Sequence, residues 1–189
     1  MTKTEKAILF ALKAHDGTKR KGKDRPYILH PLEVLTIVSA QTEDEDVLAA
    51  AVLHDTVEDT AVTLADIERE FGAPVAKLVQ AESENKRPER PAEETWQLRK
   101  QETVERVKKA SRGAKLICLG DKLANLREIS RDYNALHDKL WERFSQKDKA
   151  KHAWYYRSIC DILEAEFGTI PPIREYRALL KEVFGEDGQ

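Results

Sequence analysis

Long apolar runs are absent from this chain of 189 residues, only two cysteines are present, and neither sign of charge dominates. No apolar stretch approaches the ~20 residues that cross a bilayer, so we expect a soluble protein without a membrane partner. The two cysteines, Cys118 and Cys160, lie in apolar helical patterns without a secretory signal, which favours buried thiols and a cytoplasmic location. A net charge of −2 argues against a nucleic acid polymer as partner.

Strand-like alternation is also absent, and the few glycines stand mainly at junctions between helical patterns. We therefore predict an all-α bundle of about ten helices in a single domain, residues 1–189. Thr42 opens an expected capping box, Thr63 is an expected N-cap, and Pro31 suits a first turn. The expected helices are 4–15, 32–40, 45–59, 64–71, 74–84, 93–110, 114–130, 136–148, 150–167 and 173–184.

A polar pair interrupts the most apolar part of the sequence. His54 and Asp55 follow the run Val47–Leu53, which is typical of a buried helix, so their side chains need partners inside the fold. A metal ion is the simplest such partner. Glu58 lies four residues after His54 and Asp59 four after Asp55, so on one continuous helix these acids share the faces of the pair.

Two distant residues are candidates to complete a metal site. His30 stands before a proline, and Asp121 interrupts an apolar stripe while Asn125 projects from the same side. Imidazole and carboxylate donors suit Mn²⁺, Fe²⁺ or Zn²⁺, and four protein ligands leave a position open for water and substrate. Taken singly, His30 could close a loop by hydrogen bonding, and Asp121 could accept an ion pair from Lys122 or Arg127.

Four strings in this order resemble one family. They are Arg25–Pro31, Leu53–Thr60, Phe71-Gly72 and Gly120–Arg127. The pattern resembles the HD-domain metal phosphohydrolases, and specifically the guanosine polyphosphate 3′-pyrophosphohydrolases. These include the hydrolase domain of Rel/SpoT-type stringent-response enzymes and the stand-alone small alarmone hydrolases. The motif core covers about residues 15–130, and helices over 136–184 would complete the bundle.

The resemblance implies a metal-dependent enzyme that hydrolyses ppGpp or pppGpp, a small guanine nucleotide, to GDP or GTP and pyrophosphate. It implies Mn²⁺, with Zn²⁺ or Fe²⁺ as other choices. The implied ligands are His30, His54, Asp55 and Asp121, and the residues that activate or position the attacking water are Glu58 and Asp59.

The resemblance also implies a set of substrate contacts. Arg20 and Lys21 fall where the family holds nucleotide and phosphates, although such a basic cluster is also typical of a solvated loop. Asn125 falls where an amide touches the ribose or phosphate region, accompanied by Arg127. Tyr155 is a candidate to line the nucleoside pocket, while core packing is the alternative for this aromatic group.

Several hypotheses stay open at this point. The segment Asn85–Pro91 is either a lid over the site, in which case Lys86 or Arg87 could approach a phosphate, or a plain linker. His15 is expected to hold the basic loop against the core, and His152 to pack or lie at the surface. The enzyme could act on another nucleotide, such as a monophosphate or a dinucleotide 2′-phosphate, or the chain could be a catalytically silent nucleotide-binding regulator. A homo-oligomer and a monomer are both compatible with the sequence.

Overall fold

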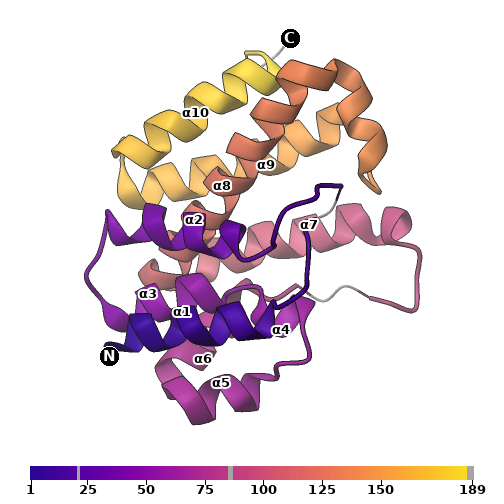
Figure 1. Cartoon of the computed structure of the whole chain (residues 1–189). Helices are drawn as coiled ribbons and strands as arrows, with labels where there is room; N and C mark the ends of the chain where they lie inside the picture. The colour runs from indigo at the N-terminus through magenta and orange to yellow at the C-terminus, as the bar shows by residue number, and fades with distance from the viewer. Residues whose placement is uncertain (21, 85–86, 187–189) are drawn as a thin grey trace. The chain divides into compact units, whose positions relative to one another are not determined.

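The computed structural model describes residues 1–20, 22–84 and 87–186. Within these ranges the chain forms ten α-helices and one 3-10 helix, and its β structure is limited to an isolated antiparallel bridge between Lys19 and Pro26 (Figure 1). The prediction of an all-α fold is confirmed. The chain divides into two compact units, Met1–Ser83 with Ser111–Asp121, and Glu84–Ala110 with Lys122–Gln189.

The first unit is built around helix α3. Its helices are α1 (Lys3–Ala14), α2 (Leu29–Ser39), α3 (Glu45–Leu53), α4 (Thr56–Asp59), α5 (Leu64–Phe71), α6 (Ala73–Glu82) and the beginning of α8 (Arg112–Leu136). Helix α3 packs against α1, α2 and α6 (Figure 1). Its side chains from Ala49 to Leu53 are fully buried, as expected for a helix that is apolar around its whole circumference.

Helix ends in this unit follow local capping chemistry. Thr63 caps α5 in a reciprocal box with Asp66, which confirms the predicted N-cap. The prediction for α3 is wrong in detail, because Asp44 is the N-cap and its carboxylate accepts from the amide of Asp46, while Thr42 accepts from the amide of Asp44. Pro31 lies in the first turn of α2, as predicted, where its missing N–H costs no helical hydrogen bond.

The second unit contains the remaining helices. They are α7 (Ala92–Lys109), the later part of α8, the 3-10 helix η1 (His137–Arg143), α9 (Lys149–Phe167) and α10 (Pro171–Phe184). Helix α9 packs against both α7 and α10 (Figure 1). The predicted α-helix over 136–148 is wrong, because His137 adopts a positive φ of 49° and Asp148 already caps the next helix.

Aromatic side chains fill the interior of this unit. His152 is buried next to Trp96 and Trp141, and its Nε2 lies 2.8 Å from the carbonyl oxygen of Gln146. His152 is therefore a packing residue, one of the two roles expected for it. Across the described parts of both units, no helix combines the length and apolarity needed to cross a membrane.

Candidate metal centre

The helix that carries the His-Asp pair is interrupted at the pair itself. The predicted continuous helix over 45–59 is wrong, because α3 ends at Leu53 and α4 begins at Thr56. Nδ1 of His54 donates to the carbonyl of Ala51 at 2.8 Å, and the Thr56 hydroxyl donates to the carbonyl of Leu53 at 2.7 Å. Such side-chain bonds compete with helical hydrogen bonding, and they leave His54 and Asp55 in a turn.

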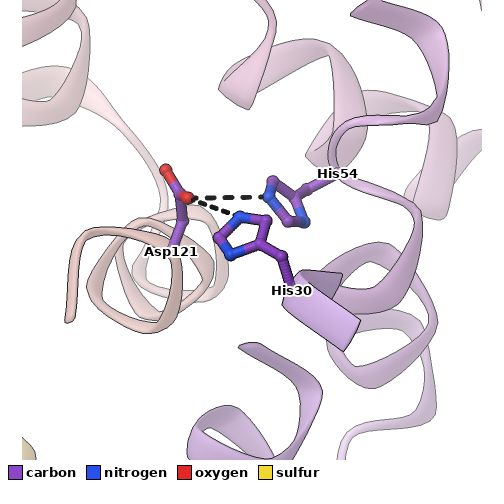
Figure 2. Close-up of side chains that lie close together, drawn as sticks. All are labelled: His30, His54 and Asp121. Carbon is purple, nitrogen blue, oxygen red and sulfur yellow. Dashed lines mark hydrogen bonds and ion pairs between the residues drawn. The ribbon is translucent and has the colours of Figure 1, made fainter. Parts of the chain in front are cut away.

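Three buried side chains converge beyond this turn. Nε2 of His30 lies 3.1 Å from Oδ1 of Asp121, and Nε2 of His54 lies 3.7 Å from the same oxygen. Figure 2 shows both imidazoles pointing toward the Asp121 carboxylate. One donor atom from each residue lies within 4.8 Å of the others, which is a spacing that could hold a metal ion. The structure thus brings together three of the four predicted metal ligands.

The fourth predicted ligand, Asp55, lies at the edge of this cluster. Its Oδ2 is 3.1 Å from Nε2 of His54 and 3.5 Å from Nε2 of His30. The carboxylate of Asp55 is 19% exposed, against 9% for that of Asp121. Asp55 therefore faces the same two nitrogens from the more open side.

Close packing of α8 on α2 places Asp121 next to the histidines. A Cβ at the preceding residue, Gly120, would lie 2.8 Å from a methyl carbon of Val38 and 3.1 Å from one of Val34. These distances are shorter than side chains tolerate without a shift, so the glycine permits the present approach of α8 to α2. Asp121, one residue later, can then reach His30 on α2.

The donor set fits a cation. Because Nδ1 of His54 donates to a carbonyl, a neutral ring carries its lone pair on Nε2. This Nε2 is buried and has no hydrogen-bond partner in the described part of the chain, although two carboxylate oxygens lie near it. Lone pairs facing one another across a buried space repel unless a positive charge stands between them. A divalent metal held by these nitrogens and oxygens meets that requirement.

The pKa shifts of His54 and Asp55 also indicate that the cluster favours a positive charge. Burial disfavours a charged imidazole at His54, but the neighbouring Asp55 and Asp121 outweigh burial and hold the pKa of His54 well above 6.5. Burial raises the pKa of Asp55, but His54 and then His30 outweigh it, so the pKa of this carboxyl lies below its usual range. Without a metal, a proton on His54 supplies the missing charge.

A tyrosine links the cluster to the candidate acid/base residues. The Tyr27 hydroxyl lies 2.6 Å from Oδ2 of Asp55 and 2.9 Å from Oδ2 of Asp59. Burial, followed by the charge of Asp55, raises the pKa of Tyr27 far above 10.0. The sequence analysis predicts no role for Tyr27, although this residue lies in the string Arg25–Pro31. Its position three residues before His30 was the available signal, because side chains three apart in a helical turn lie on the same side.

The predicted acid/base pair lies on the short helix α4. Asp59 is exposed and reaches Tyr27, whereas Glu58 is half-buried one residue earlier. Because the helix breaks before Thr56, the two acids are not presented by one continuous helix together with His54 and Asp55. The Tyr27 hydroxyl joins the carboxylate of Asp59 to that of Asp55, and the amide of Asp59 also donates to the carbonyl of Asp55 at 2.9 Å.

The predicted substrate residues fall into both units. Arg20 is half-buried in the first unit, with its guanidinium carbon 5.5 Å from the centre of the Tyr27 ring, while Lys21 lies outside the described residues. In the second unit, Asn125 and Arg127 are half-buried on α8, and Tyr155 is buried on α9. The Arg127 guanidinium donates twice to Glu175, at 2.6 and 2.7 Å.

The predicted lid segment is described only in part. Asn85 and Lys86 lie outside the described residues. Arg87, a possible phosphate contact in the lid hypothesis, donates to Glu102 at 2.6 Å. The lid and the linker both stay predictions.

The helical fold and the His-His-Asp cluster define this chain as a helical protein with a candidate divalent-metal centre. It belongs to the HD domain family, whose sequence profile matches residues 7–147.

Curated relatives and a solved structure extend this comparison. The chain is 40% identical over 127 residues to the guanosine-3′,5′-bis(diphosphate) 3′-pyrophosphohydrolase MESH1 of Danio rerio, covering 66% of this chain and 67% of the relative. It is 43% identical over 125 residues to MESH1 of Homo sapiens, covering 65% and 66%. The structure of a metazoan ortholog of SpoT, described as hydrolysing ppGpp, superposes with a TM-score of 0.77 at 29% identity and covers 98% of both chains.

Proposed function

We propose that this chain is a metal-dependent hydrolase that removes the 3′-pyrophosphate of ppGpp or pppGpp, releasing GDP or GTP. The observation that carries the proposal is the convergence of His30, His54 and Asp121 within 4.8 Å, with Asp55 beside them. The MESH1 relatives, named for this reaction, support the choice of substrate.

The proposed metal is Mn²⁺, with Zn²⁺ or Fe²⁺ as alternatives, because two imidazoles and two carboxylates form a mixed donor set. His30, His54, Asp55 and Asp121 would hold it. When bound, such an ion supplies Lewis-acid activation of water and offsets charge at the phosphate.

The protein's own residues carry the remaining chemistry. The carboxylate of Asp59 or Glu58 accepts a proton as the water oxygen attacks the phosphorus next to the ribose. The bond from that phosphorus to the 3′ oxygen then breaks, and the 3′ oxygen takes up the proton that the carboxylate had accepted from water. Asp59 is the better placed of the two acids, because Tyr27 ties it to Asp55.

Substrate binding is assigned to charged and aromatic groups. Arg20 and Lys21 offset charge on the departing pyrophosphate, since arginine offers two donors to a phosphate and lysine a point charge. Asn125 and Arg127 bind the ribose and phosphate region, and Tyr155 lines the nucleoside pocket. In the present structure, Arg127 must exchange part of its pairing with Glu175 for substrate.

The family match also bears on domain organisation. Residues 7–147 include parts of both compact units, which supports the prediction that residues 1–189 act as one hydrolase domain. The cytoplasmic location and a possible homo-oligomer stay predictions.

The direct test uses metal-stripped protein incubated with ppGpp and added Mn²⁺, Zn²⁺ or Mg²⁺, with products resolved by anion-exchange chromatography. GDP and pyrophosphate should appear only with metal, and Asp121→Asn should abolish them. Asp138→Asn is the matched control, because the Asp138 side chain is 80% exposed and its carboxylate lies 3.6 Å from the Lys149 ammonium. Turnover of another nucleotide instead of ppGpp would overturn the substrate, and turnover in metal-free protein would overturn the mechanism.

A further inference from the structure

One hydroxyl group stands between a candidate metal ligand and a candidate acid/base residue. The Tyr27 oxygen is 2.6 Å from Oδ2 of Asp55 and 2.9 Å from Oδ2 of Asp59. The same Oδ2 of Asp55 faces the nitrogens of His54 and His30 at 3.1 and 3.5 Å. Tyr27 therefore contacts the oxygen of Asp55 that is turned toward the cluster.

The chemistry of this contact couples the two carboxylates. A phenol has one proton to donate, and an ionised carboxylate can only accept. The hydroxyl can donate fully to Asp55 or to Asp59, or share its proton between them. Any change at one carboxylate thus alters the hydrogen bond received by the other.

The surroundings keep the Tyr27 ring in place. The ring stacks on His15, with centroids 4.8 Å apart and planes 29° from parallel. His15 is 3% exposed, and its ring nitrogens have no hydrogen-bond partner in the described part of the chain, so its contribution here is ring packing. The expectation that His15 holds the basic loop against the core stays a prediction.

The backbone holds Tyr27 from both sides. Its amide donates to the carbonyl of Thr18 at 3.0 Å, and its own carbonyl accepts from the amide of His30 at 2.9 Å. The residue is thus tied to the loop that carries Arg20 and to the first turn of α2. Little freedom is left for the hydroxyl to leave the two carboxylates.

We propose that Tyr27 is a positioning residue for the reaction, which holds the Asp59 carboxylate in place and orients Asp55 toward the metal through one shared hydroxyl. The catalytic part of this inference rests on the proposed function, whereas the part that concerns the metal does not. Groups that orient metal ligands in this way typically change metal affinity or activity by about 10–100-fold when they are removed.

The test is Tyr27→Phe, which keeps the stacked ring and removes only the hydroxyl. We expect kcat for ppGpp at saturating Mn²⁺ to fall by roughly 10- to 100-fold with KM within about twofold of wild type, because the group acts on the reacting geometry and not on substrate binding. Mn²⁺ affinity, measured by titration with detection of free Mn²⁺ by electron paramagnetic resonance, should fall by about 10-fold. Tyr176→Phe is the matched control, since it removes a buried hydroxyl that donates to the carbonyl of Tyr156 at 3.2 Å.

A double-mutant cycle separates positioning from general destabilisation. If Tyr27 acts through Asp59, then kcat of Tyr27→Phe combined with Asp59→Asn should equal that of Asp59→Asn alone. Additive losses in kcat would overturn the catalytic part, and so would an unchanged kcat in the single Tyr27→Phe variant. Unchanged Mn²⁺ affinity in that variant would overturn the part that concerns Asp55.

The role of Tyr27 can still be tested if the Tyr27→Phe variant does not fold or if ppGpp is not the substrate. If Tyr27→Phe fails to fold, Asp59→Asn still tests the coupling, because the hydroxyl is then freer to donate to Asp55 and Mn²⁺ affinity should change severalfold although Asp59 is not a proposed ligand. Unchanged affinity would refute the link. If the wild-type protein does not hydrolyse ppGpp, the proposed function fails, and the Mn²⁺ titrations decide the role of Tyr27 by themselves.

Discussion

Metal binding should stabilise the folded chain by an amount that can be calculated in advance. The cluster combines His30, His54 with Asp55, and Asp121, which are far apart in sequence and meet only in the folded chain. Mn²⁺ should therefore bind the native state far more tightly than the unfolded one. A free metal concentration of about 100 times Kd then adds about 2.7 kcal/mol to the free energy of unfolding. For a chain of this size that corresponds to a rise in Tm of roughly 5–10 °C.

The stabilisation should also depend on pH, with a sign set by His54. Its folded-state pKa is raised above 6.5, so the proton on His54 stabilises the metal-free protein fully below pH 6.5, and this contribution is lost as pH rises through the folded pKa. At high pH only a metal can offset the charge of Asp55 and Asp121. The gain from Mn²⁺ should thus increase with pH, because at low pH the metal must displace a proton.

The assay is urea unfolding of metal-stripped protein with and without Mn²⁺ between pH 6 and 9, followed by circular dichroism. Asp121→Asn should remove most of the difference between the two curves, while Asp138→Asn should preserve it. Coincident unfolding curves with and without Mn²⁺ across this range would refute the metal centre. If the increase in unfolding free energy caused by Mn²⁺ became smaller as pH rises, the protonation argument for His54 would be refuted.

Three other predictions concern stability and substrate binding. Glu84 is half-buried, and this partial burial raises the pKa of its carboxyl, but neighbouring lysine and arginine cations outweigh it and lower the pKa from 4.5 to about 2. Glu84→Gln should therefore cost up to about 3 kcal/mol in urea unfolding at neutral pH, and the wild-type contribution should be lost as pH falls from 4.5 toward 2. Thr63→Ala removes the N-cap of α5 and should cost about 1 kcal/mol in thermal unfolding, with Thr63→Ser restoring it. Arg127→Ala should raise KM for ppGpp by about tenfold, whereas Glu175→Gln should leave it unchanged or lower it.

A different result would contradict each of these three predictions. For Glu84→Gln it is an unfolding free energy equal to wild type, and for Thr63→Ala it is an unchanged Tm. For Arg127, equal losses of stability in Arg127→Ala and Glu175→Gln with unchanged KM would show an ion pair with a structural role alone.

Helix positions were largely predictable where local chemistry decides them. The box formed by Thr63 and Asp66 sets the start of α5, and both residues lie within four positions of one another. The glycines that follow α5, α9 and α10 have positive φ values, which side chains with a Cβ rarely adopt. Neither feature depends on distant parts of the chain.

Two of the helix predictions failed because the feature that interrupts each helix is invisible in the hydrophobic periodicity. The apolar run before His54 suggested one helix through Asp59, but His54 and Thr56 use their side chains to bond carbonyls of the preceding turn. At the 3-10 helix, the left-handed backbone of His137 stops the α-helical pattern. The spacing of hydrophobic residues predicts neither the side-chain hydrogen bonds of His54 and Thr56 nor the positive φ of His137.

The sequence by itself determined that the fold is helical and which residue types are available to a metal, because helical periodicity and a polar pair in an apolar run are local properties. Only the tertiary structure decided that His30, His54 and Asp121 converge, because contacts over such separations depend on how α8 packs on α2 at Gly120. The position of the Tyr27 hydroxyl between the carboxylates of Asp55 and Asp59 likewise depends on the tertiary structure, because these acids follow α2 in the chain whereas Tyr27 precedes it.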